Sequence, residues 1–331
     1  MRKSKKLILK LVSLVLVVLV AASVAIPTVY AAEYRKAKND VSSSYKGGRY
    51  YDNFTRVQLT GDNVTDVLAL ALSQLGYQEG NSAGQYSGTS GGSGNYTEYY
   101  YNFGDVTGNG YSMSWCAAFV SWALYQSKTT DHGKISDWCR NHEGDANYIW
   151  REISCPKWSS QLKTVGKYKT RASGYEPKSG DLIFFNRTSG GTTSIGHIGI
   201  VVWCDGSRVY TIEGNTSSGT GIEANGGGVY YKSYKLTNTG INGYGILPYK
   251  SNASALKVDY SGSKKTAGLY MVKTGQSLAV SSTEGGSTDF TVGAHYMFEV
   301  TVLHLSITIR KSGYFKHIMR ANSKCCRTTC G

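Results

Sequence analysis

Cys116 and His197 are the residues of this chain that best fit nucleophilic catalysis. Cys116 begins an apolar segment, CAAFVSWALYQ, that is typical of a helix. At a helix start, unpaired N–H groups and the macrodipole favour the thiolate, the nucleophilic form of cysteine. The same place also suits a buried, inert cysteine, so a neighbouring base must decide between the two interpretations.

His197 is the candidate base. It begins the apolar strand segment HIGIVVW, between Gly196 and Gly199, which leave space for another group to approach. In the following segment, VYTIEGN, alternation along a strand places three polar side chains on one face: Thr211, Glu213 and Asn215.

The register of the hairpin between these strands decides whether His197 faces Glu213. A three-residue loop at residues 204–206 makes paired residue numbers sum to 410 and sets the two side chains opposite each other. A two-residue Asp-Gly turn gives 411 and turns Glu213 to the other face. The catalytic interpretation therefore predicts the three-residue loop, unless a bulge resets the register.

The surrounding patterns predict an α+β fold. One helix begins at Thr60 or Asp62 and ends near Gly76, with an inward face of Val64, Val67, Leu68, Ala71 and Leu75. A second runs from residue 115 to 126, with Val120, Ala123 and Leu124 inward. Strand patterns follow at 181–185, 197–203, 208–214, 228–234 and 243–249. Helices first and strands afterwards predict N-terminal helices packed on an antiparallel sheet.

The charge of the chain lies mainly at its ends. The chain has 331 residues, 36 Lys and Arg, 22 Asp and Glu, and a formal net charge of +14. Residues 1–31 hold five bases and residues 310–331 hold six, with no acid in either segment. Residues 60–249 hold 14 bases and 15 acids, so no basic core indicates a nucleic-acid partner.

The first 31 residues are typical of a secretory signal peptide. A basic stretch precedes an apolar run at residues 11–26, and small or apolar residues follow at 29–31. The run is short for a membrane span, which needs about 20 apolar residues, although an uncleaved anchor is the alternative. We expect a secreted protein that begins near Ala32, with a polar linker at 32–59.

Four motifs together resemble the CHAP domain, a cysteine amidohydrolase/peptidase related to NlpC/P60. They are WCAAFVSW around Cys116, PKSGDLIFF at 177–185, GHIGIVV at 196–202 and IEGN at 212–215. ALSQLGYQEG at 71–80 is similar to the first helix of that family. The resemblance spans about residues 60–249, in the family's order of Cys, His and then an acidic or amide residue.

The resemblance implies a papain-like core and a secreted bacterial cell-wall hydrolase. Cys116 would attack an amide carbonyl, His197 would move the proton, Glu213 would orient the imidazole and Asn215 would be a second polar support. The Cys116 N–H and one further donor would hold the oxyanion. The substrate would be peptidoglycan, cut by an N-acetylmuramoyl-L-alanine amidase or an endopeptidase. The alternatives are a catalytically idle wall-binding protein and a secreted protease acting on proteins.

No cofactor or metal is expected. Asp105, Asn109 and Tyr111 precede the nucleophile where some CHAP domains bind Ca²⁺, but one carboxylate is few for that ion, and a polar turn is favoured. No Cys/His spacing matches zinc. A Cys139–Cys155 bridge would suit an oxidising compartment, and Cys204 is left without an assigned partner. We expect a monomer that binds peptidoglycan, with no nucleic acid and, after signal cleavage, no membrane.

The C-terminal part is predicted to be separate. A linker at 250–266 precedes residues 267–305, which faintly resemble a truncated bacterial SH3-like module without its Arg-Ser signature. Residues 306–331 change abruptly in composition, and we expect an irregular basic tail there that is not native fold, with wall adhesion as the alternative.

Overall fold

The computed structural model describes residues 40–104, 112–130, 145–223 and 225–250, and the backbone of strands between residues 256 and 311. The signal peptide predicted at residues 1–31 lies outside these residues. The helices come first, as predicted: α2 (Ser43–Lys46), α3 (Arg49–Thr55), α4 (Asn63–Ser73), α5 (Glu98–Phe103), α6 (Cys116–Gln126) and α8 (Cys155–Thr164). None of the helices within the described residues is long and apolar enough to cross a membrane.

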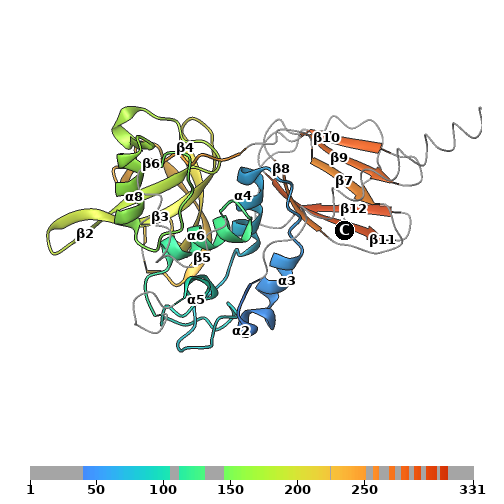
Figure 1. Ribbon diagram of the computed structural model, residues 1–331, viewed down its shortest axis with the longest axis horizontal. Helices are drawn as coiled ribbons and strands as arrows, with labels where there is room; N and C mark the ends of the chain where they lie inside the picture. Colours follow the sequence, from blue (N-terminus) through green and yellow to red (C-terminus); the bar gives the residue numbers. More distant parts are fainter. Residues whose placement is uncertain are drawn as a thin grey trace, which may run out of the picture.

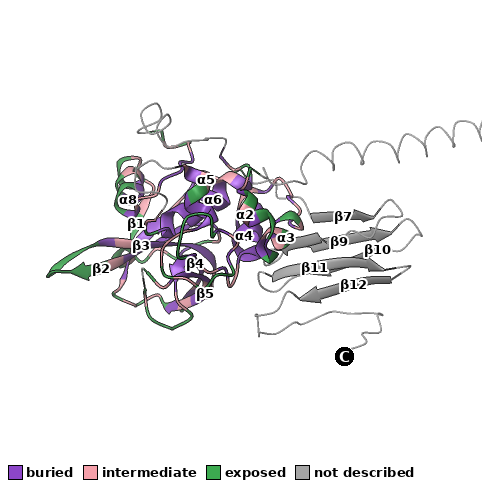
Figure 2. Ribbon diagram, turned by 90° about the horizontal axis from the view of Figure 1, so that it is seen from below, coloured by how far each residue is buried: buried purple, intermediate pink, exposed green. Residues whose placement is uncertain are grey.

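A six-stranded antiparallel sheet follows the helices, which confirms the α+β class (Figure 1). Its strands are β1 (Tyr168–Thr170), β2 (Leu182–Ser189), β3 (Thr192–Cys204), β4 (Arg208–Thr216), β5 (Gly228–Lys235) and β6 (Ile241–Gly245). They lie in the order β1-β6-β2-β3-β4-β5. The short 3₁₀ helix η1 (Arg171–Ser173) follows β1. Strands β2 and β3 are longer than predicted, because they continue as an exposed hairpin that projects from the sheet (Figure 2).

Helix α4 begins where the sequence predicts. The Asp62 side chain accepts a hydrogen bond from the Thr65 backbone N–H at 2.8 Å, which caps the first turn. Every residue from Val67 to Ser73 is buried, whereas Val64 and Leu75, predicted to face inward, are only partly buried. The helix is therefore surrounded by protein on all sides (Figure 2). The prediction of a single inward face underestimated how much of the helix is buried.

The predicted linker at 32–59 is wrong for the residues that the structure describes. Helices α2 and α3 occupy much of this segment and bury Tyr45, Tyr50 and Phe54. The rings of Tyr45 and Phe54 pack against Trp122 of α6, with centroids 6.3 and 5.6 Å away. These aromatic side chains bind the segment to the domain core, which a polar composition without long periodicity does not reveal.

Two three-stranded sheets are formed after residue 250. One has the order β10-β9-β7 and the other β12-β11-β8. Their strands are β7 (Leu256–Tyr260), β8 (Gly268–Val272), β9 (Ser277–Ser282), β10 (Ser287–Thr291), β11 (Tyr296–Leu303) and β12 (Ser306–Lys311). Strand β7 contradicts an unstructured linker at 250–266, and β12 contradicts an irregular tail from residue 306. The SH3-like assignment of 267–305 stays a prediction.

Candidate active site

Cys116 is the first residue of α6 and is buried, with 3% of its surface exposed. The preceding Trp115 provides no side-chain cap for the helix. Its indole Nε1–H donates to Glu79 Oε2 at 2.7 Å, and its ring packs 5.4 Å from the Tyr99 ring. Trp115 thus anchors the helix start, and the uncapped N–H groups of the first turn favour an anionic sulfur.

His197 on β3 and Glu213 on β4 form a buried pair. His197 Nε2 lies 2.9 Å from Glu213 Oε2, and the two side chains are 1% and 0% exposed. The Thr211 hydroxyl donates to Glu213 Oε1 at 2.5 Å, and the Tyr234 hydroxyl donates to Oε2 at 3.2 Å. The carboxylate is therefore held at both oxygens, and it in turn fixes the orientation of the imidazole.

The other imidazole nitrogen, His197 Nδ1, is buried and has no hydrogen-bond partner within the described residues. The Cys116 thiol lies close enough for each group to shift the pKa of the other. A ring with one nitrogen bound to a carboxylate and the other available to a thiol has the arrangement of a general base.

The pKa shifts of the pair favour proton transfer from sulfur to nitrogen. Burial lowers the pKa of His197, but the neighbouring Cys116 thiol and Glu213 carboxylate outweigh it and raise the pKa to about 9. The pKa of Cys116 is well below its usual value, because the hydrogen bond from Cys155 and the nearby His197 imidazole outweigh burial. Both shifts favour the ion pair of a thiolate and an imidazolium over the neutral pair.

The hairpin reaches this geometry through a bulge. Pairing near the tip, Cys204 with Val209, gives a sum of 413, and the Asp205 N–H donates to the Arg208 carbonyl at 3.1 Å. The predicted three-residue loop is therefore wrong. A register shift between Val201 and Trp203 changes the sum to 412, at the pairing of Ile200 with Ile212. An even sum places Glu213 on the same face of the sheet as His197. A bulge therefore resets the register, which was the stated exception to the three-residue loop.

Two glycines allow the elements to approach. A Cβ atom at Gly199 would lie 2.6 Å from Glu213 Cγ, so this position must be glycine for the carboxylate to reach His197. A Cβ at Gly214 would lie 2.6 Å from Phe119 Cβ, which shows how closely α6 packs on β4. Gly196, predicted to leave space near the imidazole, instead faces Arg187.

Residues 106–215 match the CHAP domain family, a stretch that includes Cys116, His197 and Glu213. The chain contains a CHAP domain. CHAP domains are typically hydrolases, either amidases or peptidases, and the match implies a peptidoglycan substrate. The chain has no match among curated proteins. A solved structure titled "The crystal structure of Ly7917" is 17% identical, over 56% of this chain and 73% of that chain, with a TM-score of 0.22.

Asn215 lies in the CHAP domain beyond the His197–Glu213 pair. Its backbone is left-handed, with φ of 56°, and its buried side chain faces other loops. The amide donates to the Asn95 and Asn225 side-chain oxygens at 3.5 and 3.4 Å and accepts from the Gly227 N–H at 3.4 Å. Asn215 therefore joins loops of the domain, and no hydrogen bond links it to the imidazole, contrary to the predicted second support.

Cys155 is the residue near the site that the sequence did not indicate. Its Sγ lies 3.4 Å from Cys116 Sγ, and both thiols are free. The suggested Cys139–Cys155 bridge is therefore wrong, and Cys139 itself lies outside the described residues. Cys204 on the hairpin is also free. No local signal marks Cys155, because nothing in the sequence relates the starts of two helices 39 residues apart.

The residues considered for calcium, Asp105, Asn109 and Tyr111, lie outside the described part of the chain. Within the part that is described, no three His, Cys, Asp or Glu residues are grouped so that they could hold a metal ion.

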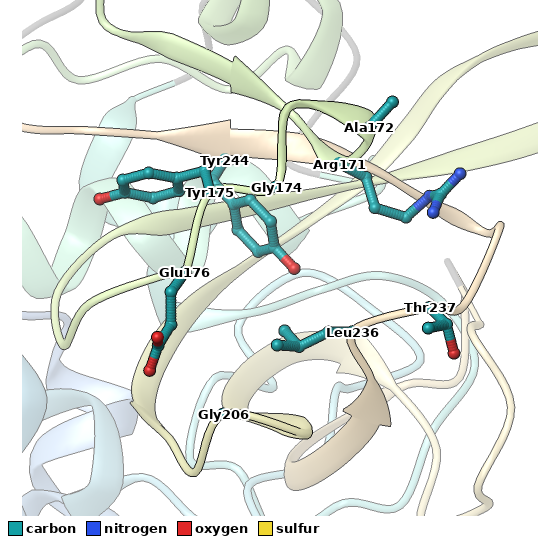
Figure 3. Close-up of a pocket in the computed structure, with 9 residues that line it drawn as sticks. All are labelled: Arg171, Ala172, Gly174, Tyr175, Glu176, Gly206, Leu236, Thr237 and Tyr244. Atoms are coloured by element: carbon teal, nitrogen blue, oxygen red, sulfur yellow. The ribbon is translucent and has the colours of Figure 1, made fainter.

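A surface pocket of about 350 Å³ lies on another part of the CHAP domain (Figure 3). Tyr175 and Tyr244 form part of its wall, and Arg171 and Glu176 bring opposite charges to it. The Cys116 thiol is not among its lining groups, so this pocket is separate from the Cys116–His197–Glu213 cluster.

Proposed function

We propose that this chain is a secreted hydrolase that cleaves an amide bond of peptidoglycan through the Cys116 thiolate. The bond is either the one that joins N-acetylmuramic acid to L-alanine, which an amidase cleaves, or one within a stem or bridge peptide, which an endopeptidase cleaves. The single observation that carries the proposal is the buried Cys116–His197–Glu213 arrangement, with the His197 Nε2–Glu213 Oε2 distance of 2.9 Å, inside a CHAP match.

The reaction would begin with attack of the Cys116 sulfur on the amide carbonyl carbon. The resulting oxyanion would lie at the start of α6, where the Cys116 N–H is directed outward from the helix. His197 Nδ1 would give its proton to the leaving amine as the C–N bond breaks, which leaves a thioester. A water molecule activated by the same nitrogen would then hydrolyse the thioester and restore the thiolate. Glu213 stabilises the imidazolium before the amine leaves and again when water is activated.

The localisation is part of the proposal. The basic and apolar pattern of residues 1–31 supports export, and the near-neutral charge of residues 60–249 gives no electrostatic reason for a nucleic-acid partner. We propose that the protein acts as a monomer on the insoluble wall polymer.

Hydrolysis of purified cell walls tests the proposal. The full-length protein and its Cys116→Ala variant are compared by release of soluble wall fragments, with Cys204→Ala as a matched control at a free thiol away from the site. We expect fragment release by the unaltered protein and the control, and none by Cys116→Ala. Equal release by Cys116→Ala would refute the nucleophile, and no release by any form, with binding retained, would indicate an idle wall-binding protein.

Mass spectrometry of the released fragments identifies the bond. A new amino terminus on L-alanine with free muramic acid carboxylate indicates the amidase, whereas a cut within the peptide indicates the endopeptidase. Cleavage of soluble proteins at similar rates would instead support a general protease.

A further inference from the structure

Cys155 contacts the nucleophile directly. Its Sγ is 3.4 Å from Cys116 Sγ, and the two residues are 6% and 3% exposed. Each is the first residue of its helix, α8 and α6 respectively, so two helix N-termini meet at the pair of sulfur atoms. A thiolate at this place would benefit from both helix dipoles, in addition to any hydrogen bond between the thiols.

The position of Cys155 is fixed by bonds to the helix that carries Cys116. The Ser121 hydroxyl of α6 donates to the Glu152 carbonyl at 2.9 Å and accepts from the Glu152 N–H at 2.8 Å. The Trp158 indole donates to the same carbonyl at 3.0 Å. Because these bonds join the segment just before Cys155 to α6, the fold holds the two sulfur atoms next to each other.

The surroundings decide which sulfur keeps the proton. The hydrogen bond with Cys116 and burial raise the pKa of Cys155 well above its usual value, and the charge of Glu152 adds to this. Cys116, in contrast, has the imidazole of His197 beside it. The titratable groups around the two sulfurs, directly or through one neighbour, are His197, Glu213, Glu79, Glu152 and Lys157. Lys157 acts on Glu152, whereas the imidazole is the cation that acts directly on Cys116.

We propose that Cys155 is a positioning residue whose S–H group donates a hydrogen bond to the Cys116 thiolate and holds the sulfur for attack. This inference rests on the proposed role of Cys116 as nucleophile and assigns the neighbour that stabilises its charged form. The hydrogen bond holds the anion and is weakened when the sulfur bonds to carbon. Its main effect is therefore on how far the active pH range extends toward acid.

The test measures the reactivity of Cys116 itself as a function of pH. The full-length protein in reducing buffer, exchanged into the assay, is treated briefly with iodoacetamide, and alkylation of the Cys116 peptide is quantified by mass spectrometry. In Cys155→Ala we expect the acid limb of the profile to move up by about one pH unit, hence a roughly ten-fold loss of reactivity on that limb. Above the limb the loss should vanish or reverse, because a thiolate of higher pKa is intrinsically more nucleophilic.

Cys155→Ser supplies the conservative variant, since its hydroxyl can donate in place of the thiol. We expect its acid limb to stay near that of the unaltered protein, with Cys204→Ala as the matched cysteine control. An unchanged limb in Cys155→Ala would overturn the inference, as would an equal loss at every pH in both Cys155 variants, which a packing role predicts. If Cys155→Ala does not fold, an upward shift in Cys155→Ser by itself overturns it.

Because alkylation needs no wall substrate, this test is independent of the proposed function. Wall hydrolysis that survives Cys116→Ala would refute the proposed function and leave the alkylation profile to be judged by itself. Loss of hydrolysis in Cys116→Ala together with identical alkylation profiles would keep the proposed function and refute the role of Cys155.

Discussion

Gly199→Ala tests whether the position of the Glu213 carboxylate controls the site. The added Cβ would lie 2.6 Å from Glu213 Cγ, while ordinary contact begins at 3.4 Å, so a shift of about 0.8 Å is required. Glu213 cannot yield freely, because its carboxylate is bonded to His197, Thr211 and Tyr234. The substitution must therefore either displace the carboxylate from the imidazole or separate β3 from β4.

The expected size of the effect follows from this displacement. Overpacking a core costs about 1–3 kcal/mol, and a Gly→Ala change returns about 0.4–1 kcal/mol through the unfolded chain, so the net loss of stability is up to about 2.6 kcal/mol. A misplacement near 1 Å can lower a catalytic rate by about 10²-fold, so we expect wall hydrolysis to fall between about ten- and a hundred-fold.

Two measurements on the same preparation separate these effects. Urea unfolding reports the change in stability, and the initial rate of wall-fragment release, at a temperature where the variant is fully folded, reports the change in activity. Gly221→Ala is the matched control, because a Cβ there meets no atom within 4 Å. A Gly199→Ala protein that keeps the unfolding midpoint and hydrolysis rate of the unaltered protein would refute the reasoning.

Three further predictions follow from the same geometry. Activity should decline as the pH rises through about 9, where the His197 imidazolium loses its proton. Glu213→Gln should move this alkaline limb of the pH–rate profile down by about one pH unit or more, because the negative charge beside the imidazolium is removed. An unmoved limb would contradict the pairing of His197 with Glu213. Gly214→Ala should lower stability in urea by about 1–3 kcal/mol, because its Cβ would press on Phe119; a variant as stable as the unaltered protein is inconsistent with this packing. Asn215→Gly and Asn215→Ala both lose the side-chain bonds of Asn215, but in thermal or urea unfolding Asn215→Ala should be less stable than Asn215→Gly by about 1–2 kcal/mol, because alanine disfavours the left-handed φ of 56°. Equal stabilities of the two variants would contradict a left-handed backbone at this residue.

Features written in short stretches of sequence were predictable. The N-cap at Asp62 and the helix start at Cys116 depend on neighbouring residues, and both lie where the patterns place them. The alternation of VYTIEGN put Thr211 and Glu213 on one face, and both side chains take part in the buried hydrogen bonds. Local rules thus identified the elements that carry the site and most of its polar groups.

Features that depend on contacts between distant segments were not predictable. Tyr234 reaches Glu213 through the pairing of β4 with β5, and Cys155 lies beside Cys116 where Ser121 ties α6 to the segment before α8. The helices before residue 60 escaped prediction for the same reason. They are short, and burial of Phe54 against the core, with 1% of it exposed, stabilises them more than their own propensity does.

The bulge at Val202 separates the hairpin tip from the site in a way that bears on engineering. Since the register shift lies between Val201 and Trp203, the facing of His197 and Glu213 is set within the strands and not by the turn at residues 205–208. Peptide tags or longer loops inserted at that tip should leave the imidazole and carboxylate together, provided that the strands keep their core packing. Removal of Val202 alone would delete the extra residue of the bulge and keep the pairing of Ile200 with Ile212, so the two groups should stay on one face of the sheet.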